Sequence, residues 1–189
     1  MLPRLRTRFD RIERQRIALL GVLARQNPAA LAYHPAPGAW SVLQVVEHLV
    51  IAEEAVMSLV EKRAPVPVPL GDRIRSAIVL RIVYSRLNSR RRLKVPRPTL
   101  NPSGDHIELE ELARRWVEVR GRMQRALEAV TPATRKDRPI GHPIAKWITW
   151  DQGLEFLFQH VRHHEKQIGR IDAGQGGTGL GRNGGRRAG

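Results

Sequence analysis

The chain has 189 residues, no cysteine and a formal net charge of +15 at pH 7. This length suits one domain with a full hydrophobic core. The lack of cysteine excludes disulfides and thiolate metal sites, so any metal must bind nitrogen or oxygen. The N-terminus has no apolar signal segment and no apolar run could cross a bilayer, so we expect a cytoplasmic protein that contacts no membrane. The charge is mostly arginine spread over several segments, which favours a solvated basic surface over a nucleic-acid site.

The first helix is predicted over residues 4–25, because apolar residues recur there at helical spacing with arginines on the other face. Asn27 and Pro28 end this helix. Residues 31–39 hold two prolines and a glycine, and a loop is expected. The apolar positions of the first helix are Leu5, Phe9, Ile12, Leu19 and Leu23.

The second helix is predicted to begin at Ser41, whose side chain can cap it, with Gln44 completing a capping box. Trp40 precedes the cap and can pack on Val45. The helix is expected to end near Arg63, before a proline-rich connector that cannot be helical. Its predicted inner stripe is Val45, His48, Leu49, Ala52, Val56 and Leu59.

Two further helices are predicted in the middle of the chain, at residues 72–89 and 109–130. The connection over residues 95–104 contains three prolines and reads as a loop. Asp105 and Glu108 resemble a capping box for the second of these helices. The candidate core residues of the 72–89 helix are Ile74, Ile78, Ile82 and Leu87.

The last helix is predicted from a capping box of Thr149 and Gln152 to about Ile171. A long connection over residues 131–148 precedes it, and no segment shows a convincing strand pattern. We therefore predict an all-α, four-helix bundle over residues 1–172, in which the arginine-rich 72–89 segment is either one of the four helices or an addition to them. Residues 173–189 are rich in glycine and arginine and are predicted to be disordered. The inner stripe of the last helix is Leu154, Leu157, Val161, His164, Ile168 and Ile171.

Three histidines form the candidate metal site. His160 and His164 lie four residues apart, which places both imidazoles on one helix face. His48 lies on the inner stripe of an earlier helix. If the two helices pack together, three neutral imidazoles converge, and a divalent ion held by three protein ligands keeps a position open for catalysis. His163 points away from this stripe and is left out.

The alternative is that these histidines only form hydrogen bonds with neighbouring backbone or carboxylate groups, since a histidine pair at this spacing is weak evidence alone. Glu165 could hydrogen-bond a ligating imidazole or face water. Most glutamates of the second helix are expected on its solvated surface, and no general base can be named. Those glutamates are Glu47, Glu53 and Glu54. The remaining histidines lie in or beside predicted loops and are expected at the surface, and the long loop that holds one of them, His142, leads directly into the metal helix. They are His34, His106 and His142.

The order of motifs resembles the DinB/YfiT-like superfamily. The chain carries WSxxxxxxHLxxxE, then GHP, then HxxxHxxQI, over about residues 5–172. The matching residues are Trp40, Ser41, His48, Leu49 and Glu53, then Gly141, His142 and Pro143, then His160, His164, Gln167 and Ile168.

The resemblance implies a four-helix bundle with long crossover connections, often a homodimer, and a divalent zinc or nickel ion on the three matching histidines, His48, His160 and His164. It also implies kinship with transferases and isomerases that use bacillithiol or mycothiol. We expect a metal-dependent hydrolase or thiol-dependent transferase acting on a small molecule, with a low-molecular-weight thiol as one candidate partner. The alternative is a non-catalytic protein whose basic surface binds nucleic acid or a stress-response partner.

Overall fold

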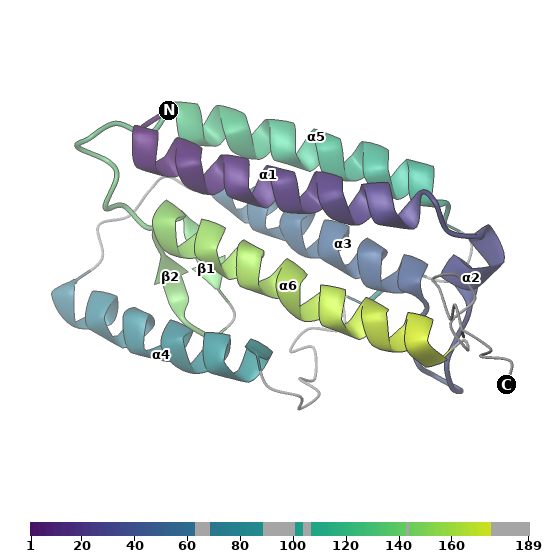
Figure 1. Ribbon diagram of the computed structural model, residues 1–189. Coiled ribbons are helices and arrows are strands. Elements are labelled where there is room, and N and C mark those ends of the chain that lie inside the picture. Colours follow the sequence, from purple (N-terminus) through teal and green to yellow (C-terminus); the bar gives the residue numbers. More distant parts are fainter. Residues whose placement is uncertain (63–68, 89–100, 104–106, 143, 175–189) are drawn as a thin grey trace, which may run out of the picture.

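The structure, a computed structural model, describes residues 1–62, 69–88, 101–103, 107–142 and 144–174 (Figure 1). It is mostly helical, as predicted. None of the helices in these ranges is both long and apolar enough to cross a membrane. The elements are α1 (Pro3–Leu23), α2 (Pro28–Ala32), α3 (Val42–Glu61), α4 (Leu70–Asn88), α5 (Leu109–Glu128), β1 (Ile140–His142), β2 (Lys146–Ile148) and α6 (Trp150–Gly174).

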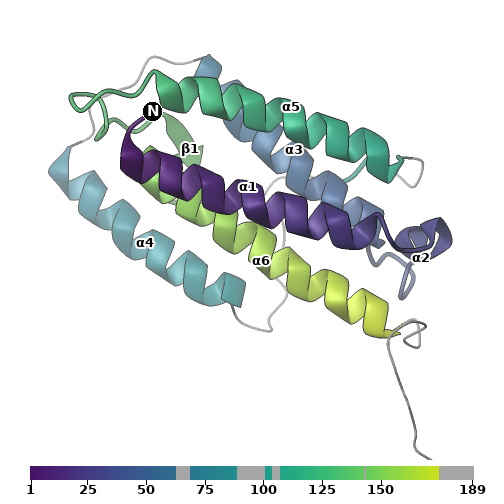
Figure 2. The same cartoon turned by 45° about the horizontal axis from the view of Figure 1, so that its top comes forward.

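Four helices, α1, α3, α5 and α6, form the bundle (Figures 1 and 2). Neighbouring α1 and α6 run parallel, because the start of α1 pairs with the start of α6 and the chain just after α1 pairs with the end of α6. Arg4 donates to Asp151 at 2.8 Å, and Gln26 donates to Asp172 at 3.3 Å.

Helices α3 and α5 are also parallel neighbours. Glu54 pairs with Arg115 and Glu61 with Arg122, so the partners advance along both helices in the same direction. Parallel neighbours cannot be joined by a short turn, since the chain must return along the full length of the bundle. The prediction of a four-helix bundle with long crossover connections is therefore confirmed.

The connection before α6 contains a β-hairpin that the sequence analysis did not predict. Strands β1 and β2 are antiparallel, with Ile140 opposite Ile148 and His142 opposite Lys146. Each strand has only three residues, too few for alternation to be visible in the sequence. The hairpin packs on the start of α6, where a Cβ at Gly153 would overlap the end of the Ile140 side chain. The absence of a side chain at Gly153 allows this close approach.

The arginine-rich segment forms α4, which is an addition to the bundle and packs against α6 and β2. The prediction of which face of α4 is buried is wrong, because the side chains of Ile74, Ile78 and Ile82 are 55%, 57% and 53% exposed. The buried face instead carries Ser76 and Leu80. A helix with apolar residues on both faces does not reveal from periodicity alone which face turns inward. The fourth candidate, Leu87, has a side chain outside the described residues.

Two of the three predicted capping boxes are present. The side chains and backbone amides of Ser41 and Gln44 bond reciprocally at the start of α3, and those of Thr149 and Gln152 do so at the start of α6. The third prediction is wrong, because Glu108 is itself the N-cap of α5 and makes no side-chain cap bond. The other residue of that predicted box, Asp105, lies outside the described residues.

Several element boundaries differ from the prediction by a few residues, among them the ends of α1, α4 and α5. The predicted loop 31–39 begins inside α2, whose start is capped by the Asn27 side chain. Helix α3 ends at Glu61, two residues earlier than predicted, and α6 continues to Gly174. The predicted disordered tail lies outside the described residues from position 175 onward.

The glutamates of α3 are not a solvated surface, contrary to the prediction. Glu47 and Glu53 are each 1% exposed, and Glu54 is bound by Arg115. Both carboxylate oxygens of Glu53 accept bonds from the buried Arg120 on α5, at 2.6 and 2.7 Å. Burying a charge is tolerable only when it is paired and hydrogen-bonded, and these partners meet that condition.

Candidate metal centre

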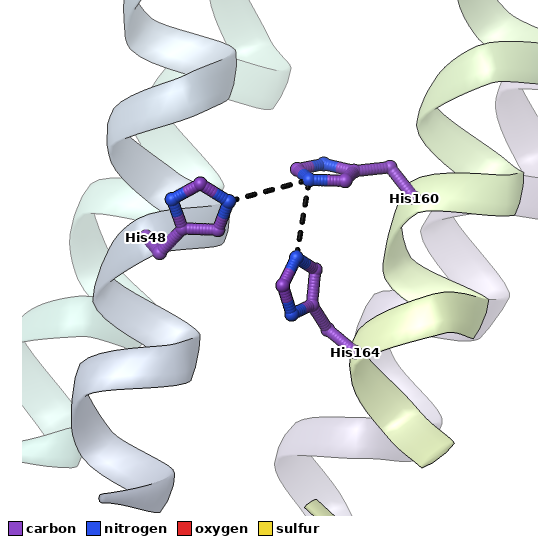
Figure 3. Close-up of side chains that lie close together, drawn as sticks. All are labelled: His48, His160 and His164. Carbon is purple, nitrogen blue, oxygen red and sulfur yellow. Dashed lines mark hydrogen bonds between the residues drawn. The ribbon is translucent and has the colours of Figure 1, made fainter. Parts of the chain in front are cut away.

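The structure brings together the three histidines singled out from the sequence. His48 projects from the middle of α3, and His160 and His164 project from successive turns of α6 toward it (Figure 3). The Nε2 atoms of His48 and His160 are 3.3 Å apart, and those of His164 and His160 are 3.2 Å apart. In the described part of the chain, this is the one group of three or more His, Asp or Glu side chains close enough to share a metal ion.

These separations fit a divalent ion bound by nitrogen. Imidazole nitrogens about 2.05 Å from a tetrahedral zinc ion lie about 3.4 Å from one another. The Nε2 of His160 faces two other nitrogens at close to this distance. A hydrogen on Nε2 of His160 can form a good hydrogen bond with only one of the two neighbouring nitrogens. A cation between the rings would instead attract the lone pairs of all three nitrogens. The donor set is therefore suited to a metal that binds imidazole, such as zinc or nickel.

A glutamine orients one of the rings. The side-chain oxygen Oε1 of Gln167 lies 2.9 Å from Nδ1 of His164. A carbonyl oxygen only accepts hydrogen bonds, so this contact places the ring hydrogen on Nδ1 and leaves the Nε2 lone pair directed at the site. Glu165, considered for this role from the sequence, instead accepts a bond from Gln15 at 3.2 Å.

The site favours neutral imidazoles, which are the metal-binding form. Burial lowers the pKa of His164 to about 3, with a smaller contribution from the positive charge that His48 would carry. Packing around the His160 ring likewise holds its pKa well below its usual range, and the neighbouring His164 adds to the effect. Both side chains therefore present free lone pairs at neutral pH.

Two aromatic rings flank the histidines. The Trp40 ring lies 5.1 Å from the His48 ring, and the Phe156 ring stacks on His160 at 5.5 Å with an interplanar angle of 13°. The packing of Trp40 on Val45 stays a prediction, and the ring contact of Trp40 with His48 is one that the sequence did not predict. Phe156 was also missed, although it lies four residues before His160 and so must share its helix face. Both rings give the site apolar walls.

His142 lies beside this group but is not part of it. Its Nδ1 accepts hydrogen bonds from the backbone amides of Ile144 and Ala145, at 3.2 and 2.9 Å. Its ring meets Phe156 edge-on at 4.6 Å, and burial lowers its pKa to about 4. His142 is thus buried, at 6% exposed, although it was expected at the surface. Its two hydrogen bonds hold the hairpin turn beside the three histidines.

The other histidines have separate positions. His163 is partly buried with its ring 5.0 Å from that of His164, but it does not join the three-histidine group. His34 is exposed, as predicted, and its Nδ1 lies 2.7 Å from the carbonyl oxygen of Ala39. His106 lies outside the described residues.

A search of solved structures finds the same fold in YfiT from Bacillus subtilis, which is described as a probable metal-dependent hydrolase with an unusual four-helix bundle topology. The two chains are 17% identical, with a TM-score of 0.53 over 91% of this chain and 87% of YfiT. No curated protein sequence matches the chain. The sequence matches the DinB superfamily over residues 11–168, and the chain therefore belongs to that superfamily.

Proposed function

We propose that this protein is a metal-dependent enzyme in which His48, His160 and His164 hold one zinc or nickel ion and act on a small molecule. The observation that carries the proposal is the convergence of three Nε2 atoms, with 3.2 and 3.3 Å between neighbours, from two helices. A group joined only by hydrogen bonds has no need of three converging lone pairs. The description of YfiT as a probable metal-dependent hydrolase supports the same reading.

An ion on three imidazoles supplies an open coordination position and lowers the pKa of a water or thiol bound there, which suits hydrolysis or thiol transfer. The protein's own residues prepare the site. Gln167 fixes the His164 ring by its hydrogen bond, and Phe156 supports the His160 ring by stacking. The ligands are thereby held in position before metal binds, which reduces the ordering cost of binding.

The walls of the site support a substrate with an apolar portion. Trp40 and Phe156 offer apolar surface on two sides of the histidines. Such surfaces suit a small molecule with an apolar portion and one group able to reach the metal, as a low-molecular-weight thiol would have.

The basic surface gives less support to a nucleic-acid-binding role. Many arginines on α1 and α5 are engaged in ion pairs between or within helices. Arg8 and Arg11 both pair with Glu155, and Arg122 pairs with Glu61. An arginine engaged in this way is a weaker partner for a phosphate backbone, because an existing pair must be broken first.

The test is elemental analysis of purified protein after reconstitution with zinc or nickel. Close to one metal per chain is expected in the wild type. The single variants His48→Ala, His160→Ala and His164→Ala should lose most of it, since two remaining imidazoles hold a divalent ion poorly. His163→Ala is the matched control, because it removes an adjacent imidazole from the same helix and should retain the metal. Equal metal in His163→Ala and His164→Ala, or none in the reconstituted wild type, would contradict the proposal.

A further inference from the structure

The outer face of α4 carries exposed aliphatic side chains at every fourth position. Leu70, Ile74, Ile78 and Ile82 are 67%, 55%, 57% and 53% exposed. Residues four apart lie one above another on a helix, so the four side chains form a strip along α4, which we call the α4 ridge. In Figures 1 and 2, α4 lies at the edge of the molecule, and no element of the described ranges covers its outer side. A contiguous apolar strip of this kind marks an interaction surface.

The opposite face of α4 attaches the helix to its own chain, so the ridge is directed outward. Leu80 is buried there, and the Ser76 hydroxyl donates a hydrogen bond to the carbonyl oxygen of Ala145 at 3.0 Å. Ile144, in the turn between β1 and β2, is 58% exposed and lines a depression together with Arg75 of α4. The hairpin therefore adds a fifth exposed aliphatic side chain beside the ridge.

Arginines flank the ridge on both sides. Arg75 and Arg81, three residues before and after Ile78, lie about 60° to either side of it around the helix. Both are exposed, and neither forms an ion pair or a hydrogen bond in the part of the chain that the structure describes. Many arginines of α1 and α5 are instead held in ion pairs. Helix α4 contains four arginines and one acidic residue, Asp72, which lies about 120° from Ile78. The ridge therefore favours an anionic partner.

The partner must match apolar side chains and cations together. A nucleic-acid backbone would pair with the arginines but would leave the isoleucines beside charged phosphates. A second copy of α4 packed on Ile78 would place its own arginines against Arg75 and Arg81, which is unfavourable. The surface of an anionic lipid bilayer meets both requirements. Apolar side chains can enter the boundary between headgroups and acyl chains, while arginine side chains extend to the phosphates.

We propose that the α4 ridge is a docking surface for an anionic lipid bilayer, on which α4 lies flat and its isoleucines enter the boundary between headgroups and acyl chains. A contact of this kind needs no segment that crosses the bilayer. The expectation of no membrane contact in the sequence analysis depended only on the lack of a signal or spanning segment, so it did not consider a surface helix. One helix with a few cations gives reversible attachment rather than permanent anchoring.

The first test is co-sedimentation of the full chain with lipid vesicles. The wild type should bind vesicles of phosphatidylcholine mixed with phosphatidylglycerol, bind vesicles of phosphatidylcholine alone much more weakly, and be released by salt. Ile78→Glu should weaken binding to the mixed vesicles by at least about 10-fold, the effect of no longer burying one such side chain. Ile17→Glu is the matched control, because Ile17 lies on the arginine-rich α1 and is 59% exposed. Circular dichroism should show both variants folded, since neither position is buried.

The second test separates the flanking arginines from the net charge of +15. The double variant Arg75→Gln/Arg81→Gln should weaken binding to the mixed vesicles by about 25-fold, since each cation near an anionic surface contributes a factor of about 5. Arg114→Gln/Arg122→Gln removes the same charge from α5, where both arginines are already paired with glutamates, and should change binding little. Equal losses in the two double variants would overturn the proposal, because attraction would then depend on net charge alone.

The third test asks whether the ridge itself enters the lipid. The chain has no cysteine, so Ser85→Cys allows one polarity-sensitive fluorophore to be attached at an exposed position about 20° from Ile78 around α4. Its emission should shift to the blue on addition of the mixed vesicles, whereas the same label in Ile17→Cys should not respond. No binding to the mixed vesicles, or equal shifts at both positions, would overturn the proposal. Self-association that Ile78→Glu abolishes, without any vesicle binding, would assign the ridge to a protein partner instead.

Discussion

The ion pair between Glu53 and Arg120 provides a direct test of how the bundle is held together. Both side chains are almost completely buried, at 1% and 2% exposed, and two bonds of 2.6 and 2.7 Å join them. Arg120→Met leaves the Glu53 carboxylate buried without its main partner. Removing one partner of a buried pair costs about 3–5 kcal/mol, because the remaining charge cannot be solvated. We expect a loss of this size in the free energy of unfolding.

A second pair between the same two helices serves as a control. Arg122 also binds Glu61 through two bonds, at 2.9 and 2.6 Å, but its side chain is 27% exposed and that of Glu61 is 46% exposed. Arg122→Met should cost only about 0–1 kcal/mol, since water and salt screen an exposed pair. The pairs differ in burial and in one further contact, because Arg120 also donates to Glu13 on α1 at 3.3 Å. Glu13 keeps a second partner, Arg16, at 2.9 Å in the Arg120→Met variant.

The measurement is urea unfolding monitored by circular dichroism. The slope of the free energy of unfolding against urea concentration is compared between variants. The double variant Glu53→Leu/Arg120→Met should recover much of the loss of Arg120→Met, because it leaves no buried charge unpaired. Equal losses in Arg120→Met and Arg122→Met would refute the argument from burial. A double variant as unstable as the sum of Glu53→Leu and Arg120→Met would show that the two residues are not coupled, and would refute the argument from an unpaired buried charge.

Three further predictions concern the site and its surroundings. Gln167→Leu should weaken metal binding about 10–100-fold in a chelator competition, because one imidazole loses the bond that orients it, while metal stoichiometry at saturation stays unchanged. In metal-free protein, the pKa of His142 is about 4 in the folded chain and about 6.5 in the unfolded chain, so the unfolded chain binds more protons between these values. The free energy of unfolding should therefore fall as the pH drops from about 6.5 to about 4, and His142→Gln should make this fall smaller. Gly153→Ala should destabilise the fold by about 1–3 kcal/mol through overlap with Ile140, whereas Gly169→Ala, with open space around it, should stabilise α6 by about 0.5–1 kcal/mol in the same unfolding assay.

The features that depend on local spacing were predictable from the sequence. The capping boxes at Ser41 and Thr149 need residues only three positions apart, and both are present. The shared helix face of His160 and His164 is similarly local. His48 required one further assumption, that polar residues on an apolar stripe meet in the core, and the structure places the three rings together.

The features that depend on which elements become neighbours were not predictable. The face of α4 was assigned wrongly because Ile74, Ile78 and Ile82 and the docked Leu80 are all apolar, and only the position of α4 outside the bundle decides between them. The partners Glu53 and Arg120 are 67 residues apart, so no spacing rule connects them. Their pairing follows from α3 and α5 being parallel neighbours, which is a property of the topology.

Helix α3 explains why charge was a poor guide to exposure in this chain. It contacts α2, α5, α6 and β1, so few of its positions can face water. His48 and Glu53 are five residues apart and therefore about 140° apart around the helix. One side chain is directed to α6 and the candidate metal centre, and the other to α5 and Arg120. A single helix thus carries two buried polar groups, each satisfied by a different neighbour, and a charged residue on such a helix indicates an interhelical partner rather than solvent.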